Sequence, residues 1–259
     1  MMSMTIESYQ PTEILSKYID SYLIINTEQT ATKSILPEPC FILAFRSKGH
    51  HHYSINDNQV DLPSSALTGL RKTVKHTTLN SKTQLISVKF KPWSTASFFY
   101  QPLSDISGIG ITLYDFIRRQ DVAEVEEQLM ESTDNGQKIN IIESFLRSLF
   151  KKDKIDTLIV AAVNTISFTE GTVKIRALAS SLNVSLDVLE KRFRKATATS
   201  PKQFSSLVRL KSIIQKRQQY ASLTEMAFES GYFDQSHFVK EFKLFAGQTP
   251  SSYFNSSPM

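Results

Sequence analysis

The spacing of apolar positions changes along the chain. Between about residues 20 and 90, short apolar runs alternate with turn-forming segments such as 47–49 and 56–58, which is typical of β-strands. The predicted strands are 22–25, 40–46, 53–55, 66–70 and 85–90. Strands of this length and spacing indicate a small β-barrel or sandwich.

After residue 94 the apolar positions recur at helical spacing. Helices are predicted over 122–131, 139–150 and 155–166, with a breaker at 133–136, and everything beyond 154 is predicted to be helical. A charged segment at 151–154 is the expected domain boundary. The sequence therefore predicts an α+β chain with a β domain (1–118), a helical linker (119–154) and an all-helical domain (155–256).

The helical domain contains a diverged internal repeat. The two copies correspond at about 175–196 and 222–245, with a slip of one residue in the turn. The paired positions are Ala179 and Ala227, Leu189 and Phe238, Lys191 and Lys240, Phe193 and Phe242, Arg194 and Lys243, Ala198 and Gly247, Pro201 and Pro250, and Phe204 and Tyr253. One supersecondary unit is therefore used twice.

Each copy has the spacing of two helices that cross at a tight turn. A small residue on the first helix, Ala179 or Ala227, allows close crossing. Asn183 and Gly231 tolerate the positive φ that such a turn requires. The second helix of each copy buries apolar residues on one side and presents polar and basic residues on the other. Two such helices form a helix-turn-helix, in which the second helix enters the major groove of DNA.

Ser200 and Pro201, between the copies, are the expected start of a linking helix that continues to about Tyr220. At 1.5 Å per residue this helix would span roughly 30 Å, close to the ~34 Å of one DNA turn. It could therefore hold two recognition helices in successive major grooves.

The distribution of charge is consistent with a polyanionic partner for the C-terminal end. Residues 171–259 contain thirteen Lys and Arg against six Asp and Glu, whereas the rest of the chain is slightly acidic, although the whole chain carries +5.

Residues 173–253 resemble the DNA-binding domain of the AraC/XylS transcription regulators. The most specific part of the resemblance is the segment 231–243, GYFDQSHFVKEFK, followed by GQTP at 247–250. Ala198 departs from the pattern, because a glycine is usual there, and we expect a tighter or shifted turn at this point. The segments 35–40, 67–70 and 86–92 resemble the cupin-like sensor domains that precede this DNA-binding unit.

The resemblance and the helical spacing together nominate residues for DNA contact. Lys191 and Lys240 are expected at base-facing positions, and Gln235 and Ser236 at adenine edges or phosphate. The full set of predicted contact residues is Ser185, Asp187, Val188, Glu190, Lys191, Lys195, Arg209, Gln235, Ser236, Lys240 and Lys243. For each of them a plain surface role stays open, and Arg209 could equally pack its aliphatic stem.

No catalytic motif stands out, and we expect neither an enzyme nor a cofactor. His50, His51 and His52 form the only tempting metal cluster, but adjacent strand residues alternate faces, so a site would need His76 or Glu38 as a further ligand. We expect no metal. Two alternatives stay open: a metal-dependent cupin enzyme fused to DNA-binding helices, and a non-specific architectural DNA protein.

The expected partners are double-stranded DNA and RNA polymerase, with a small-molecule effector and a homodimer as open alternatives. The helices within 122–150 could form the dimer seam or pack on the barrel. A single cysteine, Cys40, excludes a disulfide framework and fits a cytoplasmic protein, and no apolar stretch approaches the ~20 residues of a membrane helix.

Overall fold

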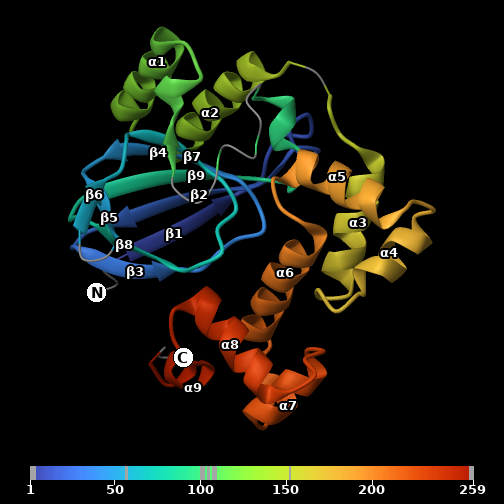
Figure 1. The fold of residues 1–259 in the computed structure, drawn as a ribbon. Helices are drawn as coiled ribbons and strands as arrows, with labels where there is room; N and C mark the ends of the chain where they lie inside the picture. Colours follow the sequence, from blue (N-terminus) through green and yellow to red (C-terminus); the bar gives the residue numbers. More distant parts are fainter. Residues whose placement is uncertain are drawn as a thin grey trace.

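The computed structural model describes residues 4–55, 58–99, 103, 106, 110–151 and 153–256, with side chains left out of the description at 53–55, 58–60 and 256. The fold is α+β, with antiparallel sheets in the N-terminal part and helices in the C-terminal part (Figure 1). The strands are β1 Met4–Tyr9, β2 Ile19–Thr27, β3 Ala31–Ile35, β4 Ile42–Lys48, β5 His51–Ile55, β6 Asn58–Asp61, β7 Ser65–Thr68, β8 Lys75–Leu79, β9 Thr83–Phe90 and β10 Ile111–Thr112.

The strands form two antiparallel sheets. The six-stranded sheet has the order β1-β2-β9-β4-β7-β10, and the four-stranded sheet has the order β3-β8-β5-β6. The expectation of a small β domain that precedes the helices is confirmed. Strands β1, β3, β6, β8 and β10 were not predicted. The segments of β1 and β3 are mostly exposed and polar, so they carry no alternating apolar face that would indicate a strand.

The helices follow in chain order. They are α1 Arg119–Glu131, α2 Asn135–Leu149, α3 Thr157–Phe168, α4 Ile175–Ser181, α5 Leu186–Thr197, α6 Pro201–Gln215, α7 Leu223–Glu229, α8 Gln235–Ala246 and α9 Pro250–Ser256, with short 3-10 turns η1 Thr95–Ser97, η3 Leu113–Asp115 and η4 Arg217–Gln219. The predicted boundary at 151–154 lies in the segment between α2 and α3.

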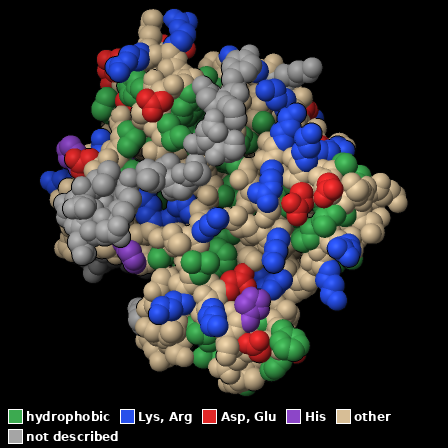
Figure 2. Space-filling view, viewed as in Figure 1, with side chains coloured by type: hydrophobic (Ala, Val, Ile, Leu, Met, Phe, Trp, Pro, Cys, Tyr) green, Lys and Arg blue, Asp and Glu red, His purple; other side chains and the backbone are tan. Residues whose placement is uncertain are grey.

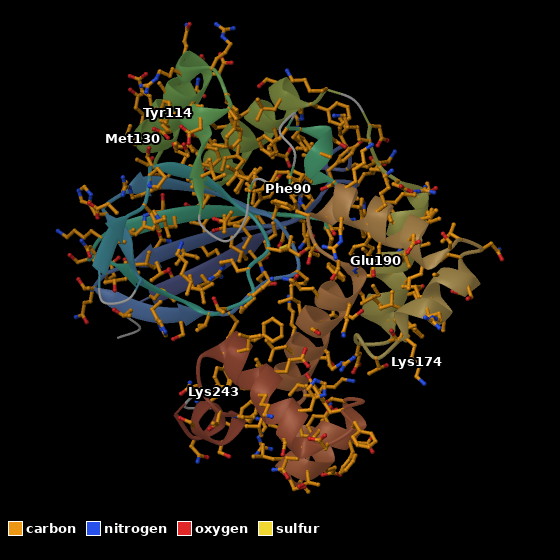
Figure 3. All side chains as sticks on the ribbon, in the orientation of Figure 1. Phe90, Tyr114, Met130, Lys174, Glu190 and Lys243 are labelled. Atoms are coloured by element: carbon orange, nitrogen blue, oxygen red, sulfur yellow. The ribbon has the colours of Figure 1, made fainter. Side chains whose placement is uncertain are left out.

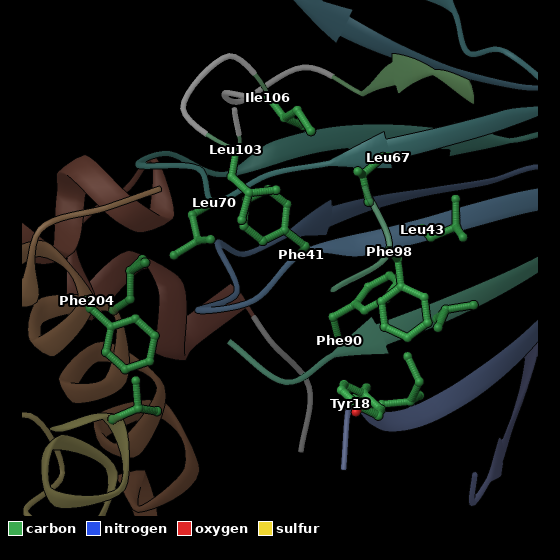
Figure 4. Packing of buried hydrophobic residues seen from close by; sticks show 14 of the residues in the cluster. Tyr18, Phe41, Leu43, Leu67, Leu70, Phe90, Phe98, Leu103, Ile106 and Phe204 are labelled. Carbon is green, nitrogen blue, oxygen red and sulfur yellow. The ribbon is translucent and has the colours of Figure 1, made fainter. Parts of the chain in front are cut away.

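One face of the six-stranded sheet packs against α1 and α2. Phe45 of β4 meets Phe145 of α2 edge to face, with ring centroids 5.8 Å apart. Ser65 of β7 donates to Glu126 of α1 (2.5 Å). The apolar stripes of these helices therefore cover the sheet. Of the two alternatives for residues 122–150, a dimer seam or packing on the barrel, the structure shows packing on the β domain. Figure 4 shows other buried residues of the same cluster, with Leu43, Leu67 and Phe90 of the sheet near Phe98.

Buried charges also attach α2 to the sheet. Glu143, 1% exposed, accepts from the backbone N–H and the hydroxyl of Thr12 (2.8 and 2.7 Å) and from the Tyr22 hydroxyl (3.2 Å). Lys138, equally buried, donates to Gln84 of β9. A buried charge persists only when it is paired and hydrogen-bonded, so these contacts fix the position of α2.

The other face of the six-stranded sheet carries half-buried residues, among them Ile42, Ala44 and Arg46 of β4. It lies toward the four-stranded sheet (Figure 1). Burial, together with the nearby cations Arg46 and Lys75, lowers the pKa of His51 on β5 to about 4, so cations from both sheets act on this side chain.

In the described part of the chain, the structure contains no helix that is long and apolar enough to cross a membrane.

Candidate nucleic-acid interface

The first helix-turn-helix unit consists of α4 and α5. Leu178 and Ala179 of α4 and Leu189 and Phe193 of α5 are buried against each other, as their spacing predicts. The Ser185 hydroxyl opens α5 by accepting from the backbone N–H of Val188 (3.3 Å).

The second unit consists of α7 and α8. Ser222 caps α7 by accepting from the N–H of Glu225 (3.1 Å), and the Glu225 carboxylate accepts from the N–H of Ala221 (2.5 Å). The Glu225 carboxylate thus bonds the N–H one residue before the one that it would bond in a standard capping box. Asp234 caps α8 by accepting from the N–H of His237 (2.7 Å).

Equivalent backbone hydrogen bonds in the two turns confirm the repeat. The N–H of Val184 donates to the Ala179 carbonyl (3.1 Å), and the N–H of Tyr232 donates to the Ala227 carbonyl (3.0 Å). Asn183 and Gly231 have φ of 54° and 77°, the positive values that the turn requires. Because the helix caps are Ser185 and Asp234, the extra residue of the second turn is Phe233, whose side chain is 90% exposed.

The outer faces of α5 and α8 are open to solvent. On α5 and its cap, Ser185, Asp187, Val188, Lys191 and Lys195 are exposed and Glu190 is half-buried; on α8, Gln235, Ser236, Lys240 and Lys243 are exposed. Figure 3 labels Glu190 on α5 and Lys243 on α8, one on each unit. Neither face is covered by the β domain, so the predicted contact residues other than Arg209 can be reached by a partner.

Positive charge is available at both units. Lys191, Lys195, Lys240 and Lys243 form no ion pair with any residue that the structure describes. Figure 2 shows Lys and Arg side chains spread over the surface of the helical domain, with a few acidic side chains among them. Such a surface attracts a polyanion without needing to break internal salt bridges.

The turn after α5 corrects one expectation. Ala198 adopts the left-handed conformation (φ 60°, ψ 10°), and its N–H donates to the Arg194 carbonyl (2.8 Å). Gly247 after α8 has φ 76° and ψ −8° and donates in the same way to Lys243 (2.9 Å). The predicted tightening or shift at Ala198 was wrong, because Ala198 accepts the glycine geometry at a steric cost.

The linking helix α6 is shorter than predicted. It begins at Pro201 with the Ser200 cap in place, since the Ser200 hydroxyl accepts from the N–H of Gln203 (3.1 Å). It ends at Gln215, and the 3-10 turn η4 follows. Fifteen residues span about 22 Å rather than roughly 30 Å. The expected continuation to Tyr220 was wrong.

Arg209 of α6 is engaged inside the helical domain. Its Nε and Nη2 both donate to the Gly171 carbonyl (3.2 and 2.7 Å), and its guanidinium lies 5.0 Å from the ring centroid of Tyr232. This geometry favours the packing alternative for Arg209 over phosphate contact.

Arg192 is a contact that sequence reasoning missed. It donates two hydrogen bonds to Asp156, the cap of α3 (2.6 and 2.8 Å), and so connects α5 to α3. These bonds hold the pKa of Asp156 below its ordinary value. The partners are 36 residues apart, so no local pattern signals the pair.

The structure does not bring the histidines together with the further ligands that a metal would need. His76 bonds to Ser34 (3.0 Å), whereas Glu38 pairs with Lys89 and Lys211. Among the described residues, no group of three or more His, Cys, Asp or Glu could hold a metal ion.

Two family models match the sequence. One, described as a helix-turn-helix domain, covers residues 178–256, and the other, a domain of unknown function, covers residues 7–111. No curated protein matches the chain.

Among solved structures, ToxT from Vibrio cholerae is similar at 13% identity, covering 98% of each chain with a TM-score of 0.45. Unsaturated fatty acid-bound ToxT from V. cholerae strain SCE256 has 11% identity, covers 97% of this chain and 95% of its own, and scores 0.44. The cupin domain of an XRE family regulator from Enterobacter cloacae has 14% identity, covers 34% of this chain and 96% of its own, and scores 0.27.

The family match falls on the duplicated unit, with both of its turns, its caps and its exposed second helices. The chain therefore contains a helix-turn-helix domain over residues 178–256, a unit whose second helix enters the major groove of DNA.

Proposed function

We propose that the chain recognises a specific DNA sequence by placing α5 and α8 in successive major grooves of one duplex. The observation that carries this proposal is the duplication itself: two equivalent helices, each capped and each open on its polar and basic side. Phosphate contacts by lysines would set the register, and side chains near the start of each helix would contact base edges.

The short α6 adds a condition to this proposal. A helix of about 22 Å does not by itself span the ~34 Å between successive major grooves. The remaining distance must come from the recognition helices lying beyond the ends of α6, or from bending of the DNA toward the protein.

Selection of bound duplexes from a random pool tests the proposal. We expect two half-sites about one helical turn apart. On the selected duplex, Lys240→Ala and Lys191→Ala should each weaken binding by ~1–3 kcal/mol. Lys33→Ala, at an exposed position on β3 of the other domain, is the matched control and should bind like the wild type. Equal binding by all four proteins would overturn the assignment.

Binding to the selected duplex also distinguishes a sequence-specific regulator from a non-specific architectural protein. A sequence-specific protein should keep its selected duplex in the presence of excess random duplex at fixed salt, whereas a non-specific one should release it. The enzyme alternative requires a bound metal, so a stoichiometric metal content in the purified protein would favour it.

We further propose that the β domain binds a small-molecule effector between its two sheets. The alternate residues of β4 that point away from the helices are only half-buried, and the buried Nδ1 of His51 has no hydrogen-bond partner among the described residues. An unpaired buried polar atom is costly unless something supplies the bond. Native mass spectrometry should find a small molecule on the wild type that His51→Ala loses. RNA polymerase and a second copy of the chain stay predictions.

A further inference from the structure

The turn between α3 and α4 lies along α6 (Figure 1). Glu170 in this turn accepts hydrogen bonds from Ser212 (2.7 Å) and from Lys216, both near the end of α6. The backbone of Glu170 has φ 52°, so the turn holds a strained conformation to make these contacts. The first helix-turn-helix unit is thus joined to the linking helix through a segment outside its own two helices.

Gly171 brings the two backbones into contact. A Cβ at this position would lie 2.2 Å from the Ser205 carbonyl oxygen and 2.9 Å from the Arg209 backbone nitrogen. Its φ of 75° also disfavours any other residue. The sequence therefore allows an approach to α6 that a side chain would block.

Arg209 carries the connection onward to the second unit. The edge of its guanidinium donates twice to the Gly171 carbonyl, while its face lies over the buried ring of Tyr232, in the turn between α7 and α8. Gly231 beside it is close to Thr172, because a Cβ there would lie 3.4 Å from the Thr172 methyl carbon. One side chain thus contacts the entry to the first unit and the turn of the second.

An arginine is suited to this position in a way that lysine is not. Its planar group can offer two N–H bonds to one oxygen and stack on an aromatic ring at the same time. A lysine ammonium, a compact point charge, cannot keep both contacts in one orientation.

We propose that Arg209 is a positioning residue that fixes the orientation of one helix-turn-helix unit relative to the other, and so determines which half-site spacing the protein accepts. This inference rests on the proposed function. Two units held rigidly should bind a correctly spaced duplex with the strength of both half-sites, and lose most of it when the spacing changes. Loosening the clamp formed by Gly171, Arg209 and Tyr232 should remove that discrimination.

The test compares wild type, Arg209→Lys and Arg209→Ala on three duplexes: the selected duplex, the same duplex with two base pairs inserted between the half-sites, and a single half-site. For the wild type we expect the insertion to weaken binding tenfold or more. For both variants we expect weaker binding to the selected duplex, an insertion penalty below about threefold, and unchanged binding to the half-site. Lys202→Ala, an exposed position on the same helix, should behave like the wild type.

The readouts separate the possible failures. Equal weakening on all three duplexes would assign Arg209 to DNA contact or to stability, and an unchanged insertion penalty in a folded variant would likewise overturn the inference. If Arg209→Ala does not fold, Arg209→Lys, which keeps the charge and most of the side-chain volume, decides the matter. A wild type without any insertion penalty would instead overturn the two-groove proposal itself.

Discussion

Lys211 Nζ of the linking helix lies 2.9 Å from Glu38 Oε2 of the β domain. Glu38 also meets Lys89 of β9 at 3.4 Å, so one carboxylate connects both sheet and helix. Burial alone would raise the pKa of Glu38, but Lys211 and Lys89 outweigh it and hold the pKa below its ordinary value. The helical domain is therefore joined to the β domain through its linking helix α6.

A double-mutant cycle should measure that connection. With Glu38→Gln, Lys211→Met and the double variant, we expect a coupling of about 0.5–1 kcal/mol in the free energy of unfolding, since the pair is partly exposed. Chemical denaturation at low and high salt checks it. A coupling near zero at low salt would mean that the pair does not join the domains energetically.

Ala198→Gly should stabilise the protein. Ala198 holds a left-handed conformation that costs a non-glycine residue roughly 1–2 kcal/mol. Glycine avoids this cost, but it loses more conformational entropy on folding, which offsets part of the gain. We expect a net gain of about 0.5–1 kcal/mol in thermal or chemical unfolding. Ala196→Gly, inside the regular helix α5, is the control and should lose a similar amount. Destabilisation by Ala198→Gly would contradict the steric argument.

Asp156 should make stability depend on pH at the acidic end. Its pKa is lowered in the folded state, chiefly by the hydrogen bonds from Arg192, so its contribution is present above the ordinary aspartate pKa of about 4. The contribution is lost as the pH falls through the lowered folded value. The wild type should therefore be more stable than Asp156→Asn at neutral pH, and the two should converge on acidification. A constant difference across that range would count against the ion pair.

Lys243→Ala should weaken binding to selected and random duplexes alike. Lys243 is exposed in the last turn of α8, a position suited to phosphate rather than to base edges. The slope of log affinity against log salt should fall by about one. Lys33→Ala provides the control. An effect confined to the selected duplex would instead place Lys243 on a base.

Local sequence rules predicted the helical domain because each of its units is built from local contacts. The caps at Ser185, Ser200 and Asp234, and the turn residues Asn183 and Gly231, act within four residues of their own position. The repeat then supplied an internal check, since both copies have the same pattern apart from one extra residue in the second turn.

Contacts between distant segments could not be predicted in this way. The ion pairs of Arg192 and Lys211, and the clamp around Arg209, join residues 23 to 173 positions apart. Strands such as β1 and β3 acquire their conformation from pairing with β2 and β8 rather than from an apolar pattern. The end of α6 at Gln215 is likewise unmarked, because no proline or glycine follows it before Gly231.

The extra residue Phe233 makes the second unit unequal to the first, and the outward side chains differ as well: Asp187 corresponds to Ser236, and Lys195 to Leu244. A single copy of the chain would thus bind DNA asymmetrically, with a different unit on each half-site. Its operator should be neither a palindrome nor a tandem repeat but a site with a direction. Inverting that site in a promoter would place the β domain on the opposite side of the site, and the affinity would stay the same.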